Sequence, residues 1–283
     1  MIIRLRVVLA ALMLLMGAVG GAVAQPALSP EAADALPAGA GGTYLDLLQL
    51  LMPGIAVDGR TYSEGRQPAG IRYLEGGVEE DVGLSPTGSL GLTAMPLRSG
   101  GMDRMALLVD FGATAYSLDF AILALFDVEG EPRLLDATDI ASGQWTSFMV
   151  PVRLSVSAGD DLLVTQSTHH NSSQGYATAS LILVRKDRFE LVDTISSFSE
   201  KDCAYERSQD LTVEQGSGEP VADIVARVTE LTVLTAEDCN GRAGPEPGSR
   251  TITVTYRWDS AAQRYIPDSD AFTQLARENE QRY

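Results

Sequence analysis

The chain has 283 residues, of which 21 are basic and 38 are acidic, and its formal net charge at pH 7 is −17. A surface with this excess of negative charge repels phosphate groups, which disfavours nucleic acid and anionic membranes as partners. The length is sufficient for one sizeable hydrophobic core.

Residues 1–24 have the three parts of a secretory signal peptide. Arg4 and Arg6 give a basic start, an apolar run follows over 7–19, and Ala22-Val23-Ala24 supplies the cleavage site. Removal of this leader takes away two arginines and no acid, so 19 basic and 38 acidic residues remain and the net charge becomes −19. The sequence therefore predicts a periplasmic or secreted, soluble product without stable membrane insertion after removal of the leader.

The segment 25–42 is rich in Ala, Pro and Gly and predicts a flexible linker. A short helix is expected to begin after Thr43, with Asp46 in a capping-box position, and to end before Pro53-Gly54. Leu45, Leu48 and Met52 fall on one face of this helix. So short a helix needs an apolar surface to dock against.

The remainder, 43–283, is expected to be a single β-rich domain. After two weak strand candidates at 70–74 and 89–97, three units share a layout of two strands, a turn and a third strand. Their strands are expected at 105–110, 118–126 and 133–135, then at 161–166, 177–185 and 189–192, and finally at 223–234, 251–258 and 264–266. The pattern predicts an all-β fold of mainly antiparallel meanders, in a β-sandwich or a curled sheet, with a propeller-like arrangement as the alternative.

Hydrophobic periodicity separates buried from half-buried strands. The strand 118–126 and the run 181–184 are apolar on both faces, which indicates central positions, whereas 251–256 alternates threonine with apolar residues and predicts one wet face. The segment 221–228 also fits helical spacing, so a helix there is an alternative. A C-terminal helix is expected over 271–281, with Phe272 and Leu275 facing inward.

The sequence contains two cysteines, Cys203 and Cys239, both downstream of the leader. An even number of cysteines in an oxidising compartment predicts a disulfide bond between them. Neither a CxxC spacing nor a nearby histidine favours a thiolate metal site, and no metal site or cofactor is predicted.

The only two histidines, His169 and His170, are adjacent in the segment 168–175, which the sequence predicts to be an irregular loop between two strands. Asn171, Gln174 and Tyr176 are the candidate binding residues beside them. Histidine is a general base and a common metal ligand near neutral pH. However, adjacent residues of a regular strand point to opposite faces, so both rings reach one ion only if the backbone is irregular.

The motifs of the common catalytic classes are missing, since neither GxSxG, HExxH nor GxxxxGK[ST] occurs. The leading hypothesis is therefore an exported, non-catalytic β-rich protein that binds a partner protein or a glycan in the cell envelope. The alternative is an envelope hydrolase that uses His169 or His170, with or without a metal ion.

Overall fold

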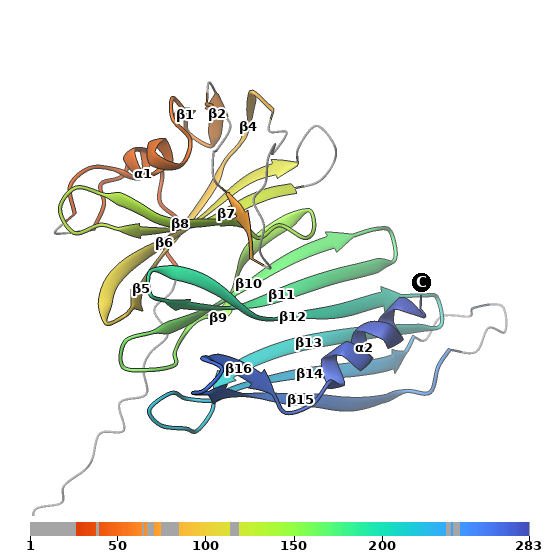
Figure 1. Cartoon of the computed structure of the whole chain (residues 1–283). Helices are drawn as coiled ribbons and strands as arrows, with labels where there is room; N and C mark the ends of the chain where they lie inside the picture. Colours follow the sequence, from red (N-terminus) through yellow and green to blue (C-terminus); the bar gives the residue numbers. More distant parts are fainter. Residues whose placement is uncertain are drawn as a thin grey trace, which may run out of the picture.

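The computed structural model describes residues 27–37, 40–63, 65–66, 71–74, 85–113, 119–235, 239 and 244–282. Strands make up most of the secondary structure in these ranges (Figure 1). In chain order the elements are α1 Tyr44–Leu51, β1 Ala56–Asp58, β2 Thr61–Ser63, β3 Arg72–Tyr73, β4 Thr87–Ser89, β5 Gly91–Ser99, β6 Met102–Ala113, β7 Asp119–Asp127, β8 Arg133–Asp139, β9 Trp145–Ser155, β10 Asp161–His170, β11 Gln174–Arg185, β12 Arg188–Lys201, β13 Tyr205–Gln215, β14 Ile224–Leu234, β15 Gly248–Asp259, β16 Arg264–Pro267 and α2 Ala271–Glu280.

These strands form three sheets. A five-stranded sheet has the order β3-β8-β7-β6-β5, an eight-stranded sheet runs from β16 to β9 in sequence order, and β1, β2 and β4 form a small third sheet. Within the described ranges every pair of neighbouring strands is antiparallel except β3 and β8. The predicted all-β class and the two short terminal helices are confirmed.

The three predicted units are present as the meanders β6-β7-β8, β10-β11-β12 and β14-β15-β16. The second and third meanders belong to one continuous sheet, whereas each blade of a propeller is a separate sheet. The propeller-like alternative is therefore wrong. The alternative helix over 221–228 is also wrong, because β14 pairs along its whole length with β13.

Two strands of the eight-stranded sheet, β9 and β13, lie between the predicted units and have no counterpart in them. Strand β13 alternates buried and exposed residues over much of its length, but the polar residues Arg207 and Gln209 at inward positions weaken the hydrophobic signal. Strand β9 is interrupted by Val150-Pro151, at an irregularity in its pairing with β10. Neither strand therefore has the uninterrupted apolar pattern from which the other strands were predicted.

Strand β7 is buried on both faces, as its sequence predicts. Ile122 and Ala124 point to a core beneath α1, and Leu123 and Leu125 point to a second core shared with the eight-stranded sheet. This second core also contains Ile182, together with other apolar residues of β9 to β12. The five-stranded sheet thus packs face to face on one part of the eight-stranded sheet (Figure 1).

Helix α1 covers the other face of the five-stranded sheet. The carboxylate of Asp46 accepts hydrogen bonds from the Thr43 N–H at 2.6 Å and the Thr43 hydroxyl at 2.9 Å, which confirms the expected capping position. Of the predicted stripe, Leu48 and Met52 are buried in the core and Leu45 is partly buried against it, while Leu47 and Leu51 beside them are also buried.

The residues before α1 also contribute to this layer. Leu28 exchanges two backbone hydrogen bonds with Ala94 at the edge of β5, and Ala32 and Leu36 are buried in the core beneath α1. The composition of this segment predicts a flexible linker, but the apolar contacts of Ala32 and Leu36 hold residues 28–36 against the sheet. The open edge of β5 is covered in consequence.

The eight-stranded sheet curls around a third core, to which both of its halves contribute. Strands β12 and β13 pair only at Glu200–Arg207 and Lys201–Glu206, and they diverge beyond these positions. Helix α2 lies on the sheet where these strands separate, and its Phe272 and Leu275 join the third core (Figure 1). The predicted C-terminal helix and its two inward residues are therefore confirmed.

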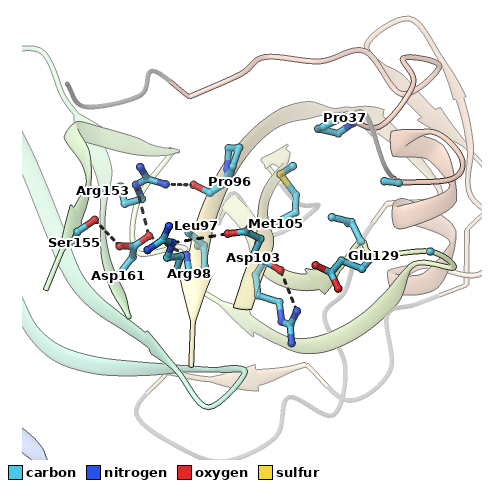
Figure 2. Close-up of a pocket in the computed structure, with 14 residues that line it drawn as sticks. Pro37, Pro96, Leu97, Arg98, Asp103, Met105, Glu129, Arg153, Ser155 and Asp161 are labelled. Atoms are coloured by element: carbon cyan, nitrogen blue, oxygen red, sulfur yellow. Dashed lines mark hydrogen bonds and ion pairs between the residues drawn. The ribbon is translucent and has the colours of Figure 1, made fainter. Parts of the chain in front are cut away.

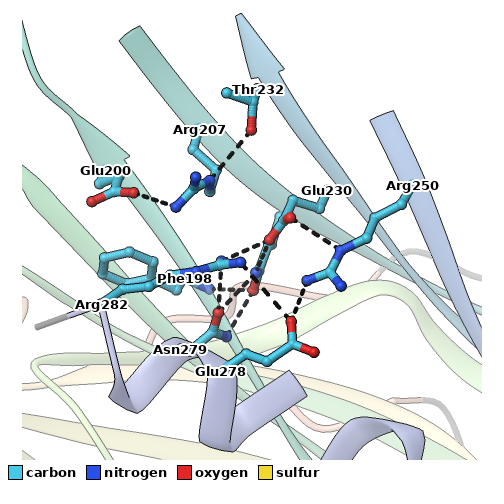
Figure 3. A network of polar contacts seen from close by, with 10 residues as sticks. Phe198, Glu200, Arg207, Glu230, Thr232, Arg250, Glu278, Asn279 and Arg282 are labelled. Carbon is cyan, nitrogen blue, oxygen red and sulfur yellow. Dashed lines mark hydrogen bonds and ion pairs between the residues drawn. The ribbon is translucent and has the colours of Figure 1, made fainter. Parts of the chain in front are cut away.

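A polar network fastens the end of α2 to the sheet (Figure 3). Glu230 accepts hydrogen bonds from Arg282 at 2.7 Å, from Arg250 at 3.1 Å and from Gln209 at 2.7 Å. The side-chain amides of Gln209 and Asn279 also bond to each other in both directions, at 2.9 Å each. Burial alone would raise the pKa of Glu230, but these donors outweigh it and lower the pKa to about 2.

Cys203 and Cys239 form the predicted disulfide bond, with their Cα atoms 5.6 Å apart. The bond joins the turn between β12 and β13 to the segment that follows β14. The two residues are separated by 36 positions, so the bond closes a loop long enough to restrict the unfolded chain considerably.

The two-sided burial of β7 predicts a large stability loss for Leu123→Ala. Leu123 has no exposed surface, and removing its side chain leaves a cavity between the sheets, so we expect the free energy of unfolding to fall by about 2 to 5 kcal/mol. Leu231→Ala is the matched control because Leu231 is 44% exposed, and it should change stability by about 0.5 kcal/mol or less. Urea unfolding of both variants measures the difference, and equal midpoints would contradict this packing.

The depressed pKa of Glu230 predicts a pH-dependent contribution to stability. Because its pKa is lower in the folded state than the ordinary value of 4.5, the contribution is complete above about pH 5 and is lost as the pH falls toward 2. Glu230→Gln should therefore lower the free energy of unfolding by about 3 kcal/mol at pH 7, and by much less at pH 3. Glu214→Gln is the control, because Glu214 forms an exposed ion pair with Arg227. If Glu230→Gln lowered the free energy of unfolding by the same amount at pH 7 and pH 3, the lowered pKa of Glu230 would be refuted.

Removing the disulfide bond by mutation and removing it by chemical reduction should destabilise the protein equally. Replacing both Cys203 and Cys239 with alanine should lower the free energy of unfolding by about 3 to 4 kcal/mol, because the unfolded chain regains the entropy of the closed loop. Treating the wild-type protein with a reducing agent should give the same denaturation midpoint as the double variant. If the reducing agent also shifted the denaturation midpoint of the double variant, the effect of reduction on the wild-type protein would not be due to the disulfide bond.

Candidate functional site

The two histidines lie at the end of a regular strand and not in an irregular loop. Strand β10 continues through His170, and its last two residues pair with β11 as His169–Tyr176 and His170–Gly175. Only Asn171, Ser172 and Ser173 form the turn. The prediction of an irregular loop over 168–175 is therefore wrong, because Thr168, His169 and His170 are polar but keep the backbone pairing of the strand.

Regular pairing sends the two histidine rings to opposite faces of the hairpin. On one face, the His169 ring lies 6.1 Å from the Tyr176 ring, and on the other, the His170 ring lies 6.4 Å from the Trp145 ring. His170 also lies over Gly175, where a Cβ atom would come within 2.8 Å of its Nδ1 atom. Both rings therefore cannot bind the same metal ion. A general-base role would need only one of them and stays a prediction.

Asn171, Gln174 and Tyr176, the three candidate binding residues, belong to one hydrogen-bond network that fixes the turn. Asn171 Oδ1 accepts the backbone N–H groups of Ser173 at 3.1 Å and Gln174 at 2.8 Å. Gln174 Oε1 accepts hydrogen bonds from Asn171 Nδ2 at 3.1 Å and from the Tyr176 hydroxyl at 2.6 Å. The three residues chosen from the sequence therefore lie together in the structure. Their hydrogen bonds fix the conformation of the turn at the tip of the hairpin.

Trp145, the first residue of β9, is a site residue that sequence reasoning missed. Its side chain is 58% exposed and lies beside His170. The signal available in the sequence was a single aromatic residue between polar neighbours, in Gly143-Gln144-Trp145-Thr146-Ser147. Burial of large aromatic side chains usually stabilises a fold, so an exposed tryptophan is informative.

The backbone on both sides of Trp145 is held in place. The Gln144 N–H donates to the carbonyl oxygen of Thr168 at 2.8 Å, and the Thr146 hydroxyl is 2.8 Å from the Ser167 hydroxyl. The Thr146 N–H donates to the Asp110 carboxylate, although burial dominates and raises the pKa of Asp110. The exposed ring is therefore presented from an ordered strand.

A second candidate region is a cleft of about 720 Å³ along β5 and β6 (Figure 2). Several of its charged side chains bond to neighbouring strands or turns. Asp161 accepts the Ser155 hydroxyl at 2.8 Å and the Arg98 backbone N–H at 2.9 Å, and Arg153 donates to the carbonyl oxygen of Pro96 at 2.6 Å. These bonds tie β9 and β10 to the edge of β5, so the polar groups here have a role in joining the two sheets.

Arg104, at the margin of the same cleft, makes a similar connection. It donates two hydrogen bonds to Asp187, at 2.9 and 3.1 Å, and it lies 3.6 Å from Asp127. The hydrogen bond from Arg104 lowers the pKa of Asp187, and hydrogen bonding from Arg133 lowers that of Asp127. The arginine is buried and its charge is balanced, which fits a structural role.

The parts of the chain that the structure describes contain no group of three or more His, Cys, Asp or Glu residues positioned to hold a metal ion. Among the same residues, no helix is long and apolar enough to cross a membrane. Comparison of the chain with protein-family models, with curated proteins and with solved structures finds no match. Function is therefore inferred from the geometry of this molecule.

Proposed function

We propose that this protein is exported, acts without catalysis, and binds a partner protein or a glycan of the cell envelope through the tip of the β10–β11 hairpin and the adjoining Trp145. The observation that carries the proposal is the Trp145 ring, 58% exposed beside His170 on a strand whose backbone is fixed on both sides. The leader-like pattern of residues 1–24 supports export, and an exported protein would meet its partner in the periplasm or outside the cell.

Preorganisation is the physical reason why this tip suits binding. Aromatic side chains supply a large contact area and have few rotatable bonds to immobilise, so an ordered tryptophan loses little entropy when a partner covers it. Tryptophan, tyrosine and arginine dominate the residues that carry binding energy in interfaces. The network of Asn171, Gln174 and Tyr176 adds a fixed turn beside the ring. Binding loops on a rigid scaffold commonly have this organisation.

The negative charge of the protein limits which classes of molecule can be its partner. The net charge of −17 disfavours polyanions, so nucleic acid and acidic membrane surfaces are poor partners. An uncharged glycan or a neutral or basic protein surface is compatible with the tip, whose residues Trp145, Asn171 and Gln174 carry no charge.

Trp145→Ala tests the proposal. Loss of the ring should weaken binding to the envelope partner by about tenfold or more, since truncating a central aromatic residue usually costs more than 1 kcal/mol. The immobilised protein would be titrated separately with the protein and polysaccharide fractions of the cell envelope, with wild-type protein as reference. A photo-crosslinking residue at position 172, in the exposed turn beside the intact Trp145 ring, would then identify the partner that touches the tip.

The matched control is Val150→Ala, which removes an exposed apolar side chain from the same strand. It should leave binding unchanged, because Val150 is 81% exposed and does not belong to the tip. Equal binding by Trp145→Ala and wild-type protein, or the absence of binding by either fraction, would overturn the proposal. Unchanged thermal unfolding of both variants would show that the fold is intact.

A further inference from the structure

One face of β11 and β12 changes chemistry along its length. Where the five-stranded sheet covers it, the face carries Ile182, Val184 and Phe189, which belong to the core shared by the two sheets. Two residues further along the same face of β11, the apolar residues give way to Ser180 and then Thr178. The hydroxyl-bearing part of the face begins where the cover ends.

This uncovered part forms the floor of a groove with a volume of about 330 Å³. Thr178, Ser180 and Thr194 line the floor, and Ser180 is paired directly with Thr194 across β11 and β12. Ligand sites in proteins usually measure about 300 to 1,000 Å³, so the groove has the size of a site for one small group.

The opposite wall comes from the end of the five-stranded sheet, with Tyr73, Asp139 and Ser142 among its residues. Tyr73 is 43% exposed at the rim. The preceding residue, Arg72, is anchored by bonds to Asp136 at 2.5 Å and to the carbonyl oxygen of Phe189 at 2.6 Å. The wall that carries the Tyr73 ring is thus fixed to both sheets.

The three hydroxyl residues of the floor carry no charge, although the protein is strongly acidic. The outward face of β13 carries the exposed acids Glu206, Asp210 and Glu214 at every fourth position, with Ser208 and Thr212 between them. By contrast, Thr178, Ser180 and Thr194 present hydroxyl groups without charge, although the chain has 38 acids in total. Exposed strands elsewhere also carry hydroxyl residues, as β15 does at Thr251 and Thr253, so the floor is set apart by its place in a groove opposite Tyr73.

We propose that this groove binds a segment of an uncharged polysaccharide. Hydroxyl groups both donate and accept hydrogen bonds, and they match the alternating donors and acceptors of a sugar ring. The exposed Tyr73 ring offers an apolar surface for the C–H face of a pyranose. An anionic polysaccharide would be repelled by Asp139 and by the net charge of the protein.

The groove is a site separate from Trp145. Thr178, on the groove floor, lies on the same face of β11 as Tyr176, the neighbour of His169, whereas Trp145 lies with His170 on the other face. The inference therefore goes beyond the binding role proposed for the tip, and each site can be tested while the other stays intact.

The double variant Thr178→Val and Thr194→Val tests the groove, because valine keeps the shape of threonine and replaces its hydroxyl with a methyl group. Calorimetric titration with cello-oligosaccharide and chito-oligosaccharide should show binding of at least one to the wild-type protein, and about tenfold weaker binding to the double variant. Thr253→Val is the matched control, since Thr253 is an exposed strand residue on β15, away from the groove. Thr253→Val should bind the sugar as the wild-type protein does.

Tyr73→Ala removes a side chain from the rim of the groove and should also weaken sugar binding about tenfold. This variant keeps the groove testable if the double variant fails to fold. Oligogalacturonate, a polyanionic sugar, should not bind. The inference is overturned if neither neutral oligosaccharide binds the wild-type protein, if the folded groove variants keep full affinity, or if oligogalacturonate binds as tightly as the neutral sugars.

Discussion

The contact between the five-stranded sheet and one part of the eight-stranded sheet is the constraint on which the rest of the structure depends. Strand β7 contributes residues such as Leu123 to this contact from one face, while Ile122 on its other face packs beneath α1. Polar side chains at the margin of the contact bond across it: Arg104 pairs with Asp187, and Arg72 and Asp136 bond to the backbone of Phe189. These polar contacts lie around an apolar centre, so they fix the register of the sheets while burial supplies the driving force.

The same contact decides which surfaces remain for binding. The cover ends near Ile182, so the groove begins there, and the hairpin projects beyond the cover with its tip ordered by its own hydrogen bonds. A more extensive contact between the sheets would bury Thr178 and Thr194, whose hydroxyl groups would then need partners inside the protein. The hydroxyl residues Thr178 and Thr194 therefore fit a contact between the sheets that ends near Ile182 and leaves them accessible to solvent.

The third core is closed in a different way. Strands β12 and β13 separate after two residue pairs, and α2 covers the opening with two apolar residues and the network around Glu230. A buried carboxylate without donors would be strongly destabilising, and here Arg282, Arg250 and Gln209 supply them. Polar contacts with defined geometry suit this position, because a short helix with only Phe272 and Leu275 in the core needs directional bonds to fix its orientation.

Local periodicity accounts for what the sequence predicted correctly. The two-sided apolar pattern of β7, the wet face of β15 and both helices depend on neighbouring residues, and their side chains are placed as expected. The end of β10 was mistaken for a loop because its pairing with β11 is a property of the backbone that polar side chains conceal. Trp145 was missed because a lone aromatic residue gives no periodic signal.

The groove could not be foreseen because it joins residues that are far apart in the chain. Tyr73 and Thr178 are separated by more than a hundred positions and meet only through the packing of two sheets. In the sequence, Thr178 and Ser180 look like any hydroxyl residues of a strand, since threonine is favoured in strands for its branched side chain alone. What distinguishes them is their place just beyond an apolar contact and opposite an anchored tyrosine. A binding surface formed in this way belongs to the tertiary structure, so its residues carry no local motif by which sequence comparison could find them.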